Sequence, residues 1–202
     1  MSGSSPTRSA VIELKDERRA MHEGYVFLDE KCLLLAGEIL RQLERHAALQ
    51  RTLVAAQERA IGALQAAVAR HGLRGLQVAP AAGDGGLQLQ RAVTSLMGVK
   101  LQAVTQQGAA DAAPAAVEAS PELESCREAH AALIAAAVPL AAVAGNLERL
   151  SAEYRRAVRR ARALQDVMLP ELDRTIGDFE GRLEEMDQED AVWMRRGAGP
   201  HV

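Results

Sequence analysis

The sequence has few aromatic residues and few cysteines. Of its 202 residues, 2% are aromatic, with one Trp, two Tyr and two Phe, although 48% are apolar. Much of that apolar content is alanine, so large side chains are too few for a thick globular core. An apolar fraction this high also argues against a disordered chain. Composition therefore favours helices that pack closely along narrow seams.

Motifs for catalysis or metal binding are missing from the sequence. Cys32 and Cys126 form no CxxC pair and lie in no His/Cys cluster, so we expect two reduced thiols. No GxxxxGKS/T, GxGxxG, GxSxG or HExxH motif occurs. The five histidines show no mutual helical spacing. We therefore expect a non-catalytic protein without a cofactor or a metal.

Neither sign of charge dominates the composition. The chain has 27 acidic and 24 basic residues, a net charge of −3, which indicates neither nucleic-acid nor anionic-membrane binding. Residues 1–10 have no apolar run of a secretory signal, so we expect none. The charge-free segment Ala131–Leu147 is shorter than the ~20 residues that span a bilayer. It predicts a tightly packed helix, with a membrane span as the alternative, and we expect no direct membrane insertion.

Residues 153–196 carry one narrow apolar stripe. Its members recur at steps of three or four, broken only near Asp190, which is the spacing of one face of a long helix: Tyr154, Ala157, Ala161, Leu164, Met168, Leu172, Ile176, Phe179, Leu183, Met186 and Trp193. A stripe this narrow requires a partner helix. The helix is expected to begin after Ser120 with Pro121 in its first turn. Pro139 and Pro170 should bend it locally, and we expect a kinked but continuous helix.

The partner stripe lies in the first 70 residues. Leu14, Met21, Leu28 and Leu35 repeat every seven residues, as in a coiled coil. After Ile39 the stripe moves by an extra step of four, which predicts a stutter, and it continues through Leu43, Ala47, Val54, Ile61, Leu64 and Val68. The first clear helix stop is His71–Gly72.

Antiparallel pairing of the two stripes sets an expected register. It places Ser9 near Asp190 and Arg70 near His130, so that the numbers of paired residues sum to about 200. In this register Cys32 lies ~60 Å of helix from Cys126, too far for a disulfide.

Residues 72–120 are rich in turn-forming residues. Within them Leu87–Leu89 and Val99–Val104 alternate apolar and polar side chains, which predicts a small β-hairpin near Met97 and Gly98. Residues 108–120 predict a mobile loop. The expected fold is mainly α, a long antiparallel two-helix coiled coil with a small central hairpin and loop insert. The expected segments are 1–71, 72–120, 121–196 and a disordered tail, 197–202.

Two features of the second helix suggest contacts with partners. Arg155, Arg159 and Arg162 share one helical face, which favours either a solvated face or a basic band that meets an acidic partner surface. Trp193 is either a packing residue at the helix end or an apolar bearing contact. The carboxylate pairs Glu184–Glu185 and Glu189–Asp190 fit an exposed face that keeps the helix soluble.

Three blocks of the sequence form a recognisable succession along nearly the whole chain. The first contains Pro6-Thr7-Arg8, Leu14-Lys15, Gly24, Phe27-Leu28, Lys31 and Leu35. The second is Leu96-Met97-Gly98-Val99-Lys100. The third contains Tyr154-Arg155-Arg156, Arg159-Arg160, Ala163-Leu164, Pro170, Leu172, Thr175-Ile176, Arg182-Leu183 and Glu185. In this order the blocks resemble the D subunit, the central rotor component of V-type and archaeal A-type ATPases, although Arg162, Gln165 and Asp29 depart from the family pattern.

The resemblance implies a non-catalytic rotor shaft that transmits torque between a nucleotide-binding hexamer and a membrane ring of a proton- or sodium-translocating ATPase or ATP synthase. It implies hexamer-pore contacts through Leu14, Arg18, Met186, Trp193, Arg195 and Arg196. It implies rotor-partner contacts through Met97, Gly98, Val99, Arg155, Arg159 and Arg162. The implied partners are the catalytic and non-catalytic nucleotide-binding subunits, the small F subunit of the rotor and the funnel-shaped subunit that couples to the membrane ring, with no nucleic acid. The implied location is cytoplasmic, peripheral to the membrane through the complex.

Two alternatives remain open at this stage. The stalk protein of a type III or flagellar export ATPase is also a two-helix rod, but it leaves the Met97-Gly98-Val99 segment unexplained. A generic coiled-coil adaptor or nucleic-acid-associated factor is supported only by the arginines at positions 155–162.

Overall fold

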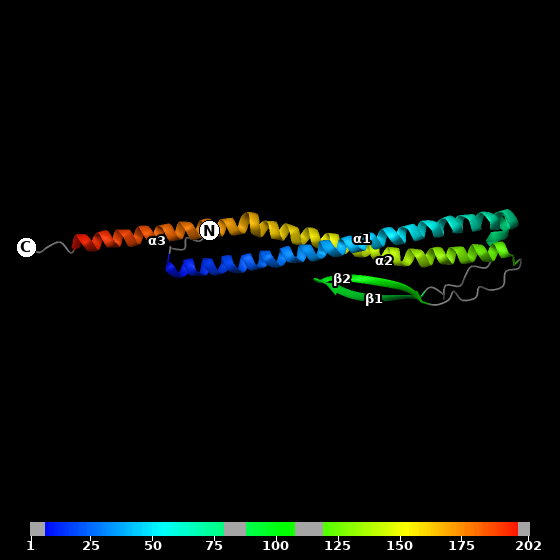
Figure 1. Cartoon of the computed structure of the whole chain (residues 1–202), viewed down its shortest axis with the longest axis horizontal. Helices are drawn as coiled ribbons and strands as arrows, with labels where there is room; N and C mark the ends of the chain where they lie inside the picture. Colours follow the sequence, from blue (N-terminus) through cyan, green and yellow to red (C-terminus); the bar gives the residue numbers. More distant parts are fainter. Residues whose placement is uncertain (1–6, 79–87, 108–118, 198–202) are drawn as a thin grey trace, which may run out of the picture. The chain divides into compact units, whose positions relative to one another are not determined.

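The computed structural model describes residues 7–78, 88–107 and 119–197, and its chain divides into two compact units. Unit 1 contains Met1–Leu34 and Tyr154–Val202, and unit 2 contains Leu35–Glu153. The elements in chain order are α1 (Arg8–Val78), β1 (Gln88–Leu96), β2 (Val99–Gln107), α2 (Pro121–Ala163), the π-helical turn η2 (Leu164–Met168) and α3 (Leu169–Gly197) (Figure 1). The predicted fold class, long N- and C-terminal helices with a small hairpin between them, is confirmed.

In unit 1 the start of α1 runs antiparallel to α3. Three ion pairs join the helices: Arg8 to Asp187 at 2.9 Å, Lys15 to Glu180 at 2.7 Å, and Arg18 to Asp173. The paired numbers therefore sum to 195, 195 and 191, and the predicted register near 200 is wrong by several residues. Periodicity marks which face of a helix is apolar, but it does not say how far the partner slides along that face.

In unit 2, buried residues of α1 follow a seven-residue repeat. Leu35 and Gln42 are buried one repeat apart, and so are Ala60 and Ala67. The predicted stutter after Ile39 is wrong, because the large residues that suggested it are 41–49% exposed: Leu43, Val54, Ile61 and Leu64. Alanine at the seam lets two helices approach closely, so small side chains are buried where large ones would not fit.

The predicted stop at His71–Gly72 is a break in α1. Gly72 has φ 66° and ψ 166°, and the helix resumes beyond it up to Val78. His71 Nε2 lies 2.6 Å from the Ser120 hydroxyl, which also accepts a hydrogen bond from the Leu123 backbone N–H at 3.1 Å. Ser120 thus caps α2 at its N-terminus, and Pro121 begins the helix as predicted.

The two prolines do not end the second helical stretch. α2 passes through Pro139 without interruption. Pro170 follows the π-helical turn η2, in which the Leu169 backbone N–H bonds to the Leu164 carbonyl. A proline cannot donate to the carbonyl four residues earlier and its ring crowds that carbonyl, so a wider turn just before Pro170 relieves both problems.

The hairpin is longer than the sequence predicts. β1 and β2 have nine residues each and pair antiparallel from Gln88 opposite Gln107 to Leu96 opposite Val99. Met97 and Gly98 form the two-residue turn with φ 48° and 85°, the positive values that a tight hairpin turn requires. Most of the predicted mobile loop and of the predicted tail, namely residues 108–118 and 198–202, lies outside the described residues, as does Leu87.

By length and composition, one helical stretch of the described chain, Pro121–Arg196, could cross a membrane. Only 17% of its apolar window is buried. The segment Ala131–Leu147 within it buries Val143 and Asn146 but leaves Ile134 47% exposed. It packs on one side, and is less tightly packed than predicted.

Candidate functional site: partner-binding surfaces

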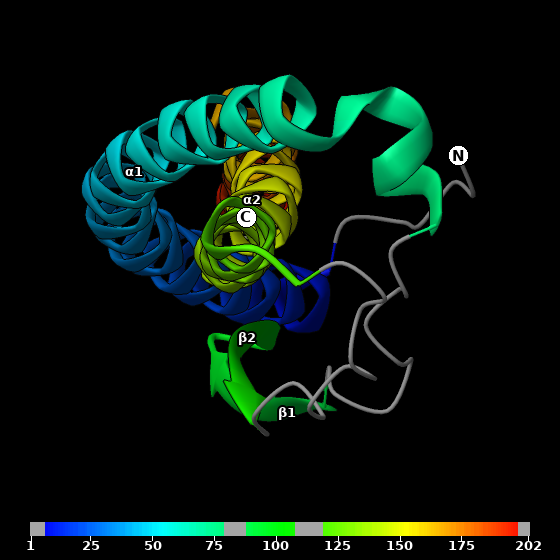
Figure 2. The same ribbon diagram turned by 90° about the vertical axis from the view of Figure 1, so that its right-hand side faces the viewer.

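Side chains of α2 hold the hairpin in unit 2. The Gln102 backbone N–H donates to Asn146 Oδ1, and Asn146 Nδ2 donates to the Gln102 carbonyl, both at 2.8 Å. Arg149 Nε donates to the Lys100 carbonyl at 3.0 Å, and its second nitrogen donates to Asn146 Oδ1 at 2.7 Å. Figure 2 shows the hairpin beside α2, as Figure 1 does.

The hydrogen-bonding residues of α2 were missed by sequence analysis. Asn146 is 4% exposed although it is polar, and it is the only asparagine of the chain, lying in an otherwise charge-free segment. Gly145 leaves room beside it, since a Cβ there would lie 3.4 Å from the Arg149 guanidinium. A polar residue within an apolar run was the one signal that could have pointed to this contact.

The hairpin turn contains three predicted site residues. Gly98 is exposed, Met97 is half-buried and Val99 is 6% exposed. Val99 therefore contributes to the packing of unit 2, and of these three residues Gly98 is the one presented outward.

The basic band, Arg155, Arg159 and Arg162, lies exposed on α2 in unit 1. None of the three has an ion pair or hydrogen bond with the part of the chain that the structure describes. Ala157 and Ala161, on the other face, are buried. The helix therefore packs through small residues and presents its guanidinium groups outward, where they are available to a partner.

The last part of α3 extends beyond the described start of α1. Arg8, the first residue of α1, pairs with Asp187, so residues 188–197 add ~15 Å of helix with no described helix opposite them. Trp193 is 76% exposed, and Val192 and Met194 are also exposed.

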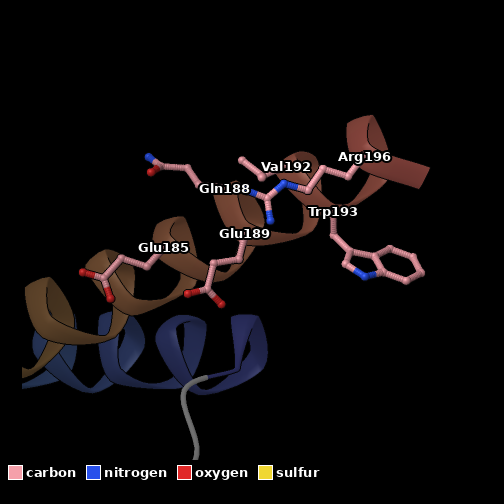
Figure 3. Close-up of a pocket in the computed structure, with 6 residues that line it drawn as sticks. All are labelled: Glu185, Gln188, Glu189, Val192, Trp193 and Arg196. Atoms are coloured by element: carbon pink, nitrogen blue, oxygen red, sulfur yellow. The ribbon is translucent and has the colours of Figure 1, made fainter. Parts of the chain in front are cut away.

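An open hollow of about 460 Å³ lies on this end of α3. It is lined by Glu185, Gln188, Glu189, Val192, Trp193 and Arg196. Figure 3 shows the Trp193 ring pointing away from the helix and the Arg196 side chain running back towards Val192. The surface is apolar with a charged border, the composition typical of a site that is covered by another protein.

The six residues expected to face a hexamer pore have different surroundings. Leu14 is half-buried in the seam, and Arg18 is engaged with Asp173. Met186, Trp193, Arg195 and Arg196 are exposed. The first two hold the helices of unit 1 together, whereas the other four are presented outward.

A second apolar stripe on α1 was assigned to the seam by sequence analysis. In unit 2 its large members Leu43, Val54, Ile61 and Leu64 are exposed, and so is Leu40, which the sequence analysis did not place in the seam. Their spacing keeps them on one side of the helix, next to but distinct from the buried alanines. Exposed apolar residues in such a row are typical of an interface with another helix.

The cysteines have no nucleophilic setting. Both are free; burial and the Asp29 carboxylate raise the pKa of the half-buried Cys32 thiol, against a smaller opposite effect of Lys31. Cys126 Sγ lies 3.7 Å from His130 Nδ1, but that nitrogen lies 2.8 Å from the Cys126 carbonyl and donates to it. Among the described residues no group of three His, Cys, Asp or Glu side chains is placed to hold a metal ion.

Comparison with known proteins places the chain in one family. Residues 10–196 match the family model of the ATP synthase D subunit. The chain belongs to the ATP synthase D-subunit family. The resemblance seen in three blocks of the sequence is confirmed, and with it the predicted function of a central stalk component of a V/A-type ATPase. The stalk of an export ATPase and a generic adaptor are not favoured.

Individual relatives cover almost the whole chain. The A-type ATP synthase D subunit of Pyrococcus horikoshii is 25% identical over 195 residues, which are 95% of this chain and 91% of the relative. The V-type ATP synthase D subunit of Thermotoga neapolitana is 23% identical over 193 residues, 95% of each chain. That of an Anaeromyxobacter species is 27% identical over 208 residues, 97% of this chain and 93% of the relative.

Proposed function

We propose that this chain is the rotating shaft of its ATPase, transmitting torque between the nucleotide-binding hexamer and the membrane ring without catalysing a reaction itself. The observation that carries the proposal is the paired seam, in which antiparallel helices are joined by small buried residues and by ion pairs. Two helices joined along a seam resist bending and twisting better than one helix does. The chain acts in the cytoplasm, peripheral to the membrane through the complex.

The end of α3 is the proposed bearing surface within the hexamer. Met186, Trp193, Arg195 and Arg196 are exposed there, on a helix that extends past the start of α1. The exposed Trp193 ring can slide against an apolar lining of the hexamer pore without breaking hydrogen bonds. The flanking charged side chains keep the free protein soluble. Leu14 and Arg18 support this end by fixing α1 against α3.

The basic band and the hairpin turn are the proposed contacts with rotor partners, the small F subunit and the funnel-shaped subunit. Arg155, Arg159 and Arg162 present positive charge that fits an acidic partner surface. The exposed stripe from Leu40 to Leu64 adds an apolar row that fits an amphipathic partner helix, with anchors at helical spacing. Charge would guide association, and apolar contact would supply most of the affinity.

Truncation after Asp187 tests the bearing surface. It keeps all three ion pairs between α1 and α3, so the isolated chain is expected to keep its helices. In a reconstituted complex with the nucleotide-binding subunits and rotor partners, we expect ATP hydrolysis to lose its coupling to ion transport. Asp190→Asn, at an exposed position of the removed segment that does not line the hollow, is a matched single substitution that should leave coupling intact. Full coupling in the truncated complex would contradict the bearing role.

Replacing Arg155, Arg159 and Arg162 with Gln tests the basic band. We expect at least a tenfold loss of affinity for the isolated small rotor subunit or the funnel-shaped subunit, with weaker salt dependence. The same change at Arg45, Arg51 and Arg74, also exposed, is the charge-matched control. Unchanged binding to both partners would show that the basic band is only a solvent-exposed face.

The non-catalytic role has its own test. Measurable ATP hydrolysis by the isolated chain would overturn it.

A further inference from the structure

The outer edge of β1 is an open hydrogen-bonding edge. In a hairpin with a two-residue turn, the pair next to the turn, Leu96 and Val99, is hydrogen-bonded, and the pairs then alternate. The backbone groups of Leu89, Arg91, Val93 and Ser95 therefore point away from β2. None of these four residues has a hydrogen bond with another described residue, and all four are exposed.

The corresponding edge of β2 is occupied at Lys100 and Gln102. The outward-pointing groups of Gln102 are bonded by the Asn146 amide, and the Lys100 carbonyl is bonded by Arg149. Side chains of α2 thus occupy the place of a neighbouring strand on that side. These bonds agree with the alternation, and they leave β1 with the longer open edge of the described hairpin.

The chemistry around the β1 edge selects one kind of strand. On the face that carries the outward-pointing residues, Leu89 and Val93 are 52% and 50% exposed, and Arg91 lies between them. Lys100, opposite Ser95, projects from the same face. The hairpin from Gln88 to Gln107 contains these two cations and no acidic residue. A strand that matches this face has an acidic residue between two apolar ones.

We propose that the outer edge of β1 is a docking site for an extended, acidic segment of a partner protein, which adds to the hairpin as a third strand. The backbone of the segment bonds to Arg91, Val93 and their neighbours, and its acidic side chain pairs with Arg91. A two-stranded hairpin is only marginally stable alone, so a third strand also stiffens it. The inference does not depend on the rotary function, because it rests on the edge and its charge alone.

A synthetic peptide of the repeating form valine-threonine-glutamate-threonine-valine is the probe, with lysine in place of glutamate as its matched partner. The pattern reads the same in both directions, so strand orientation does not affect the fit. Titration into the full-length protein is followed by backbone amide NMR. We expect saturable shifts and increased exchange protection at Arg91, Val93 and Ser95, with at least tenfold weaker binding of the lysine peptide.

Two substitutions separate strand addition from other contacts. Val93→Pro removes one outward donor but no bond to β2, so it should weaken peptide binding at least tenfold while Thr94 and Leu101 keep their protection. Arg91→Glu should reverse the preference between the two peptides, which a purely structural residue would not do. Thr94→Ala, on the opposite face, is the control with unchanged binding.

Several results would overturn the proposal. These are the absence of saturable binding, protection that appears on β2 or on the helices instead, or a preference that Arg91→Glu leaves unchanged. Self-association that protects Arg91 and Val93 without peptide would also overturn it, since a second copy would then occupy the edge.

Discussion

The Asn146 side-chain amide and the Gln102 backbone exchange two hydrogen bonds, each 2.8 Å long. The Asn146 amide thereby makes the pair of hydrogen bonds that a neighbouring strand would make with Gln102. This pair fixes the position of β2 along α2. Because Asn146 is almost fully buried, loss of its side chain would leave both Gln102 groups without these partners.

Asn146→Ala should release the hairpin. We expect faster amide hydrogen exchange at Gln102 and a fall of about 1–3 kcal/mol in the free energy of unfolding, because two part-buried hydrogen bonds are lost. Gln50→Ala, on the exposed face of α1, is the control and should change neither quantity. Unaltered exchange at Gln102 would show that the hairpin is held by other contacts.

Ala67→Leu should destabilise the protein, whereas Ala66→Leu should have almost no effect on its stability. Ala67 is fully buried in the seam, and three added carbons would force the helices apart, lowering the free energy of unfolding by about 1–3 kcal/mol. Ala66 is exposed, and its substitution should change that energy by less than about 0.5 kcal/mol. Denaturant unfolding of both variants checks the seven-residue seam, and equal effects would refute it.

Gly72→Ala and Gly62→Ala should shift stability in opposite directions, although a Cβ would meet no atom within 4 Å at either site. Gly72 has a positive φ and an extended ψ that only glycine adopts readily, so alanine there should cost about 1–3 kcal/mol. Gly62 lies in a regular helix, where alanine should add up to about 1 kcal/mol. Thermal unfolding distinguishes the signs. A stabilising Gly72→Ala would mean that α1 runs straight through this position.

The carboxyl of Glu122 should make stability depend on pH in the acid range. A backbone hydrogen bond at Glu122 is the largest cause that lowers its pKa below the ordinary 4.5, and the Ser120 side chain, Arg70 and His71 add to it, while desolvation opposes it. Because the pKa is lower in the folded state, the carboxylate stabilises the fold above pH 4.5, and this contribution is lost as pH falls through the depressed value.

Unfolding of Glu122→Gln as a function of pH measures this contribution. The variant should be less stable than the parent at neutral pH and should converge with it below the depressed pKa. Glu128→Gln, on an exposed position of the same helix, should leave the pH profile parallel to that of the parent. A constant difference between Glu122→Gln and the parent at all pH values would rule out the linkage.

Much of the fold follows from local patterns. The heptad from Leu14 to Leu35, the Ser120-Pro121 helix start, the Gly72 break and the Met97–Gly98 turn each depend on a few neighbouring residues, whose conformational preferences act wherever the segment lies. Among the proposed contact residues, the exposed side chains of Arg155, Arg159 and Arg162 also follow from helical periodicity, whereas periodicity placed the exposed Trp193 in the apolar stripe. The family resemblance rested on the same kind of short blocks.

What periodicity could not decide is which of two apolar stripes on α1 faces its partner. By sequence, Leu43, Val54, Ile61 and Leu64 are the more hydrophobic row, yet the structure buries Ala56, Ala60 and Ala67 and leaves the large residues exposed. The choice depends on how closely the two helices approach, a property of both surfaces together. The same holds for Asn146 and Gln102, which lie 44 residues apart and whose pairing exists only once the hairpin is packed on α2. The sequence alone thus determined the elements and the family, and tertiary packing decided the register, the buried stripe and the strand edge that remains open.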